Sequence, residues 1–171
     1  VTSSTCTSTL ATSTSCTINA TRIVLGTDPD PLPNIVTVHY NPDGFTNDIT
    51  DWDDHSVNLF TAGFTIDKTG DTVSKIGDEV TYTYTITNMS SSDAPALNLN
   101  SLVDDKIGDL TLQANYDSAC DELVYGEECS FDVVWEIPDG ASDPYVNRVD
   151  AQYQVAGFSN TFDEFDTHSV N

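Results

Sequence analysis

Hydrophobic and polar residues alternate along several short segments of the chain, which is the pattern of half-buried β-strands. The alternation is clearest over residues 80–88, where an apolar face is formed by Val80, Tyr82, Tyr84 and Ile86. The residues between them are all threonine, and β-branched and aromatic residues suit a pleated surface. The same period of two recurs at Phe64/Ile66, Leu97/Leu99, Leu110/Leu112, Phe131/Val133/Trp135/Ile137 and Val149/Ala151/Tyr153/Val155.

Turn-forming residues separate these segments, and no stretch shows the period of an amphipathic helix. Glycine, proline, aspartate and serine favour turns, and they gather at residues 75–78, 90–95, 108–109 and 138–140. About seven short strands within about 110 residues are typical of an immunoglobulin-like β-sandwich. The sequence therefore predicts an all-β protein made of immunoglobulin-like β-sandwich modules in tandem.

The tandem arrangement is predicted because the chain contains part of itself twice. Cys16 to Asn58 align without a gap with Cys129 to Asn171 at a constant offset of 113 positions, and 14 of the 43 aligned pairs are identical. A fixed period indicates a repeat array. We therefore expect a complete module at residues 59–171 and the C-terminal half of another at residues 1–58. A half-module buries little core, so we expect its completion in cis by further sequence or in trans by another chain.

Residues 62–105 resemble the conserved-repeat family of immunoglobulin-like modules, which occur in tandem in bacterial and archaeal surface proteins. The resemblance rests on a lysine that closes the first strand, a Gly-Asp-x-Val-Thr-Tyr strand, a Thr-Asn turn and a following segment that ends near an aspartate. Here these features are Lys68, residues 77–82, residues 87–88 and Asp104. The resemblance implies an extracellular structural or adhesive role and no active site.

The charge of the chain is extreme: 28 acidic residues face five basic ones, which gives a net charge of −23. Such a chain has little to neutralise phosphates, so we expect neither nucleic acid nor an anionic membrane surface as a partner. No apolar run is long enough to be a transmembrane segment, and we expect no direct membrane insertion. The self-repulsion must be screened by salt, as on a halophilic surface, or neutralised by bound cations.

The four cysteines form two local pairs, Cys6/Cys16 and Cys120/Cys129. The second member of each pair occupies the same repeat position, and the first is displaced by one. A pair duplicated with its repeat predicts two disulfides, each joining neighbouring strands. Buried free thiols are the alternative, and a zinc site is disfavoured because the spacing is wrong and no histidine is nearby. Disulfides imply an oxidising, extracellular compartment.

An acidic segment at residues 41–54 is the best candidate for a cation site. It lies between a strand and the start of the next repeat, and its oxygen-bearing side chains suit calcium: Asp43, Asn47, Asp48, Asp51, Asp53 and Asp54. The spacing is not that of an EF-hand loop. The equivalent second-copy segment keeps Asn160, Asp163, Glu164 and Asp166. A solvated acidic loop, in which these residues cap turns, is the alternative interpretation.

Three further features have a structural and a functional interpretation. His55 and His168 repeat, and we expect them to pack where each module ends rather than to bind metal. Asn19 and Asn88 begin N-glycosylation sequons, although short motifs also arise by chance. Lys68 could form an isopeptide bond with Asn147 or Asn171, but no acid can be assigned to assist, so we expect a plain lysine.

These features together predict a structural module rather than an enzyme. No Ser-His-Asp or Cys-His group and no glycine-rich phosphate loop is present. We expect a module of an extracellular fibre, filament, sheath or S-layer-type array, whose partners are copies of itself or neighbouring repeats joined head to tail. The alternative is an adhesin or carbohydrate-binding module with glycan partners, which exposed aromatic residues on one sheet face would favour.

Overall fold

The computed structural model describes every residue from Val1 to Asn171, and the protein is all-β. The chain divides into two compact units, Val1–Leu59 (unit 1) and Phe60–Asn171 (unit 2). This boundary lies one residue beyond the one expected from the repeat. The only helices are two short 3-10 turns, η1 (Leu110–Leu112) and η2 (Ser118–Asp121), and neither is long and apolar enough to cross a membrane.

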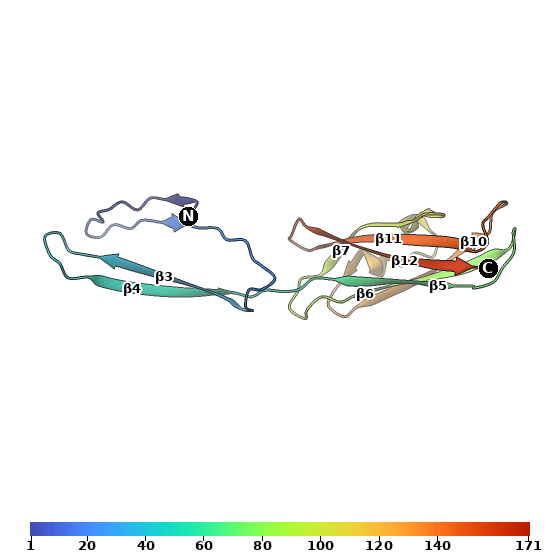
Figure 1. Cartoon of the computed structure of the whole chain (residues 1–171), viewed down its shortest axis with the longest axis horizontal. Helices are drawn as coiled ribbons and strands as arrows, with labels where there is room; N and C mark the ends of the chain where they lie inside the picture. Colours follow the sequence, from blue (N-terminus) through green and yellow to red (C-terminus); the bar gives the residue numbers. More distant parts are fainter. The chain divides into compact units, whose positions relative to one another are not determined.

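Unit 2 consists of two antiparallel sheets (Figure 1). One sheet has the order β10-β6-β5, formed by Glu128–Glu136, Glu79–Asn88 and Phe64–Gly70. The other has the order β12-β11-β7-β8, formed by Thr161–Val170, Tyr145–Val155, Leu97–Asp104 and Gly108–Asp109. The short β9 (Glu122–Leu123) also pairs with β7. The coarse prediction of a β-sandwich is consistent with this arrangement.

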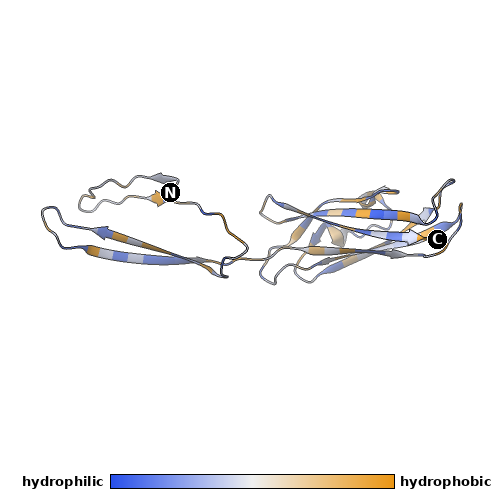
Figure 2. Ribbon diagram, in the orientation of Figure 1, coloured by the Kyte–Doolittle hydropathy of each residue, from blue (hydrophilic) through white to orange (hydrophobic).

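A single hydrophobic core is formed by the inward faces of these strands. The alternation seen in the sequence decides which residues enter it, because successive side chains of a strand point to opposite faces. Val80, Tyr82, Tyr84 and Ile86 of β6 are all buried. β11 shows the same alternation of hydrophobic and hydrophilic residues in Figure 2.

The apolar pair Leu110/Leu112 is not part of a strand, and here the prediction is wrong. These residues form η1, whose preceding residue Asp109 accepts a hydrogen bond from the backbone N–H of Thr111. Aspartate at such a position satisfies an otherwise unpaired donor of the first turn. Leu110 is fully buried whereas Leu112 is exposed, which fits a turn and not a strand, because residues two apart on a strand share one face.

Unit 1 contains two separate two-stranded sheets. One joins β1 (Ser3–Ser4) to β2 (Ile18–Asn19), and the other joins β3 (Leu32–Tyr40) to β4 (Ile49–Val57). Leu32 is the only buried residue of this unit. Unit 1 therefore has strands without a core.

The hairpin β3–β4 is the repeat-equivalent of β11–β12 in unit 2, since both occupy the same positions at the offset of 113. Each hairpin turns at a glycine with positive φ, Gly44 at 79° and Gly157 at 84°, a conformation that glycine adopts without steric cost. The acidic segment at residues 41–54 does not form a single loop. Its last part, residues 49–54, lies in strand β4.

Candidate functional site

The inward face of β11 has an exposed counterpart on β3, which we call the open face. The open face consists of the exposed Asn34, Val36 and Val38 and the partly exposed Tyr40, whereas Leu32 at the start of β3 is buried. The equivalents of these four residues in unit 2 are all buried: Asn147, Val149, Ala151 and Tyr153. Val36 is 54% exposed and Val149 0%, whereas Val38 is 43% exposed and Ala151 2%. Equivalent residues therefore have opposite environments.

Unit 2 shows which elements cover this face when a module is complete. β11 pairs with β12 on one side and with β7 on the other, and residues of the opposite sheet pack on it, as Phe64 does on Tyr153 with ring centroids 4.8 Å apart. β3 pairs with β4 alone. Its other edge keeps unpaired backbone groups, which makes it competent to accept a further strand.

Asp53 on β4 has a structural counterpart that explains its place in the repeat. The equivalent residue of unit 2, Asp166, accepts a hydrogen bond from the backbone N–H of Lys68 on β5 at 2.7 Å. Asp53 is exposed. This carboxylate position thus fastens the last strand of a complete module to its first strand.

The candidate calcium ligands are not gathered at one point. Asp43 lies in the β3–β4 turn, whereas Asp51, Asp53 and Asp54 are spread along β4. Asp48 is engaged by His39, whose Nδ1 lies 2.8 Å from Oδ2, and this hydrogen bond lowers the pKa of Asp48. No group of three or more His, Cys, Asp or Glu side chains in the protein is arranged to hold a metal ion. Calcium binding through these residues and Asn47 stays a prediction.

Both predicted disulfides are present, Cys6–Cys16 and Cys120–Cys129. Cys120 and Cys129 are buried in the core of unit 2, whereas Cys6 and Cys16 are partly exposed. Cys120 lies in η2 rather than in a strand, so its disulfide fastens a 3-10 turn to β10. Cys6 and Cys16 lie just outside β1 and β2 rather than in them. The expectation that each disulfide joins two strands is therefore wrong for both.

The two sequons have different surroundings. Asn19 is exposed on β2, and glycosylation there stays a prediction. Asn88 is buried at the end of β6; its Nδ2 donates to the carbonyl of Leu123 at 2.8 Å, and its Oδ1 accepts from the N–H of Ser90 at 2.9 Å. A folded unit 2 leaves no room for a glycan on this side chain.

His168 has a structural position. Its Nε2 lies 2.9 Å from the carbonyl oxygen of Asp71, and its ring packs edge-on against Tyr82 with centroids 5.9 Å apart. His55, the equivalent residue in unit 1, is exposed on β4. The repeated histidine thus belongs to the inward-facing edge of a complete module.

A buried ion pair lies in the middle of unit 2. Its acid is Asp104, which the sequence alone does not assign to Lys68. The side chains of Lys68 on β5 and Asp104 on β7 are both fully buried, with Nζ 2.5 Å from Oδ2. Tyr84 also donates its hydroxyl to this Oδ2 at 2.7 Å. Burial lowers the pKa of Lys68, and the contact with Asp104 opposes that change. Lys68 had a sequence signal, because it continues the inward series Phe64, Ile66.

Asn147 on β11 is a buried neighbour of Tyr82 and makes no hydrogen bond within the protein. The residue is 0% exposed, and neither Nδ2 nor Oδ1 is bonded within the protein. The Tyr82 hydroxyl is also unpartnered. Burial raises the pKa of Tyr82 to about 12, and the nearby amide of Asn147 opposes this rise. Leaving a buried polar group unpaired costs about 1–3 kcal/mol, so this asparagine requires an explanation.

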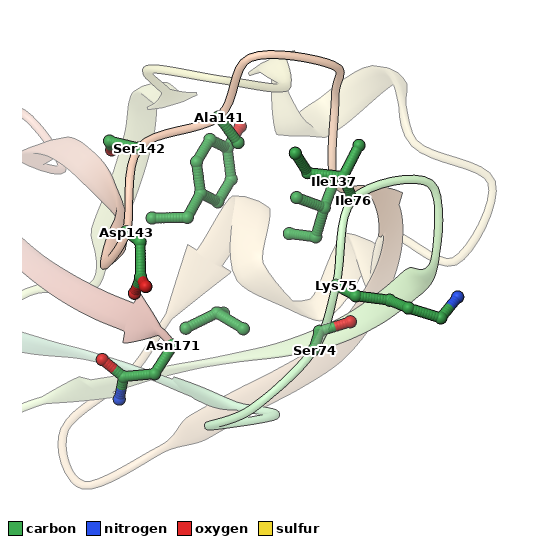
Figure 3. A pocket seen from close by; sticks show the side chains of 10 residues that line it. Ser74, Lys75, Ile76, Ile137, Ala141, Ser142, Asp143 and Asn171 are labelled. Atoms are coloured by element: carbon green, nitrogen blue, oxygen red, sulfur yellow. The ribbon is translucent and has the colours of Figure 1, made fainter.

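A shallow pocket opens at one end of unit 2 (Figure 3). Ser74, Lys75 and Ile76 line it from one side, and the segment from Ile137 to Asp143 lines it from the other, with Asn171 at its edge. This end of unit 2 lies where β12 finishes, and it corresponds in unit 1 to the end where β4 finishes. There Asp30, the counterpart of Asp143, accepts a hydrogen bond from the N–H of Leu59 at 3.0 Å. The pocket therefore lies at a module end.

A scan against protein-family models and searches of the curated proteins and of the solved structures returned no match for this chain. The resemblance of residues 62–105 to the conserved-repeat modules therefore stays a prediction.

Proposed function

We propose that this protein is a structural module of an extracellular repeat protein that forms a surface fibre, filament, sheath or S-layer-type array. The observation that carries the proposal is the open face of β3. The chain repeats the residues that build a buried module face, and in unit 1 it leaves them uncovered. Such a face becomes buried when the first half of a repeat covers it, and repeats that follow one another at a fixed period form an array.

The segment that covers the open face is the first half of a repeat, equivalent in sequence and fold to residues 59–113. In unit 2 that half supplies β5, β6 and β7, which are the strands that cover β11. Asp53, His55 and Asn34 keep the identities of the unit 2 residues that face these strands. Head-to-tail completion uses two different surfaces on each partner, so it builds an open filament unless the rotation between partners closes it into a ring.

Immunoglobulin-like topology is part of the same proposal. The division of unit 2 into β10-β6-β5 and β12-β11-β7 corresponds to the separation of strands A, B and E from C, F and G in an immunoglobulin sandwich. The resemblance of residues 62–105 to surface repeats supports the assignment. The two disulfides support an oxidising, extracellular location, and the net charge of −23 keeps an array solvated at its surface.

Hydrogen exchange on an extended chain tests the proposal. In this chain a second copy of residues 59–113 is placed directly before Val1, which restores the register of the repeat. We expect the backbone amides of β3 to become protected to the degree of those of β11, because they gain a paired strand and a core. The control chain carries the same added residues in scrambled order. Equal exchange of β3 in both chains would contradict the proposal.

A further inference from the structure

The inward face of unit 2 brings an amine, a carboxyl group and an amide together in the core. Lys68 Nζ contacts Asp104 Oδ2 at 2.5 Å and lies 4.5 Å from the centre of the Tyr82 ring. Tyr82 in turn is the buried neighbour of Asn147. The three groups belong to β5, β7 and β11, so the fold rather than the local sequence assembles them.

The strand register places Asn147 next to Asp104. Val149 on β11 is paired with Asp104 on β7, and Asn147 precedes Val149 by two positions. Residues two apart on a strand share a face, and diagonal neighbours of paired strands are within side-chain reach. Asn147 therefore lies on the same inward face as Asp104, with both of its polar atoms unpartnered.

The carboxyl group is held in a fixed orientation. Oδ1 of Asp104 accepts the backbone N–H groups of Lys106 and Ile107 at 2.9 and 3.0 Å. Oδ2 accepts from Lys68 and from the hydroxyl of Tyr84. A carboxyl group anchored in this way, in contact with a buried amine, is placed to exchange protons with it.

We propose that Lys68 and Asn147 are joined by an intramolecular isopeptide bond that the protein forms itself, with Asp104 as the proton-transfer group. The sequence alone assigns no acid to Lys68 and therefore predicts a plain lysine. The structure supplies the acid, and it buries the Asn147 amide without a hydrogen bond, with the Tyr82 hydroxyl nearby. Asn171, the other asparagine considered, is exposed at the edge of the module-end pocket.

The reaction balances without a cofactor. Asp104 takes a proton from the Lys68 ammonium, and burial of the lysine favours the neutral amine that results. Nζ then attacks Cγ of Asn147, the proton held by Asp104 passes to Nδ2, and the Cγ–Nδ2 bond breaks with loss of ammonia. The second Nζ proton is shed to Asp104 as the amide forms. One N–C bond replaces another, and no atom changes its oxidation state.

The repeat offers independent support. Asn34 occupies the position of Asn147 in the first copy and is one of the identical pairs. An asparagine with no hydrogen bond is an unexpected residue for a core position. Its presence in both copies fits a position where the amide itself reacts.

Intact mass spectrometry tests the bond directly. The purified chain, folded and then denatured with its disulfides reduced, is expected to weigh less than its sequence by one ammonia molecule. Peptide mapping should find one branched peptide that links the segment around Lys68 to the segment around Asn147. A full sequence mass in protein whose unit 2 is shown by hydrogen exchange to be folded would overturn the proposal.

Variants separate the isopeptide bond from other losses of ammonia, such as cyclisation of an asparagine alone. Lys68→Met, Asn147→Ala and Asp104→Asn should each restore the full mass, and Asp104→Asn keeps the shape of the side chain. Lys75→Met and Asn34→Ala are the matched controls and should still lack one ammonia. Persistence of the loss in Lys68→Met, or absence of the branched peptide, would overturn the proposal even if the other variants fail to fold.

Discussion

The hairpins β3–β4 and β11–β12 have related sequences and different surroundings. On β11 the residues Asn147, Val149 and Ala151 are enclosed by β7 and by the opposite sheet, whereas on β3 their equivalents Asn34, Val36 and Val38 are exposed. The backbone forms the same hairpin in both. The hairpin is thus specified locally, but burial of its apolar face depends on strands that precede it in the repeat.

The extended chain gives the largest expected difference between the two hairpins. If the added residues complete unit 1, a copy of Lys68 and a copy of Asp104 come to face Asn34. We expect this chain to lack two ammonia molecules instead of one, and Asn34→Ala to restore one of them. Intact mass of the denatured, reduced protein measures both. A single loss together with protected β3 amides would mean that the module closes without reacting.

Replacing the equivalent tyrosines of the two hairpins should have very different effects on the stability of unit 2. Tyr153 is fully buried, and its hydroxyl donates to the carbonyl of Cys120 at 2.6 Å. Tyr153→Ala should lower the free energy of unfolding of unit 2 by about 3–5 kcal/mol, as for other large-to-small core changes. Tyr40→Ala should leave that transition unchanged. Guanidinium denaturation followed by circular dichroism measures the two, and similar effects would contradict the comparison.

Removal of the unit 2 disulfide should lower the free energy of unfolding of unit 2, whereas removal of the unit 1 disulfide should not. This difference should be smaller than that between the two tyrosine variants. Replacing Cys120 and Cys129 by alanine should destabilise unit 2 by about 2–3 kcal/mol, since the bridge restrains a loop of roughly ten residues in the unfolded chain. Replacing Cys6 and Cys16 by alanine serves as the control and should not move the unfolding midpoint of unit 2. An equal shift from both double variants would show that the units unfold together.

Calcium should give the smallest effect. The acidic residues of β4 are spread along the strand, and Asp48 is engaged by His39. We therefore expect sodium and calcium salts of equal ionic strength to raise the melting temperature similarly, by screening the net charge of −23. Scanning calorimetry with and without a chelator measures this. A calcium-specific rise that Asp51→Asn and Asp53→Asn remove would establish the predicted site instead.

The sequence predicts the strands whose alternation is strong and misses β4 and β12, whose alternation is weak. β6 is evident because threonines and large apolar residues alternate without interruption. β12 has the composition of an acidic loop, because its inward residues include Asp166 and His168, which are polar yet face the first strand of the module. The inward position of an acid becomes meaningful only when the backbone N–H of Lys68 is placed beside it.

The buried cluster could be foreseen only in part. Lys68 interrupts an apolar series, and Asn147 does so on β11, so each carries a local signal of an unusual inward residue. What no local pattern contains is their meeting with Asp104, since the three residues lie on three strands from separate parts of the chain. The strand pairing that brings them together is a property of the whole sandwich.

The strands at which the chain enters and leaves unit 2 have a consequence for a protein under tension. Phe60, at the start of the unit, packs against Phe158 in the β11–β12 turn, whereas Asn171 exchanges backbone hydrogen bonds with Thr72 and Ser74 at the far end of β5. β5 and β12 therefore run in the same direction, and a pull on the two termini slides one strand along the other. Contacts along both strands then bear the load together instead of opening one after another, and the resistance of the unit is governed by its rate of forced unfolding.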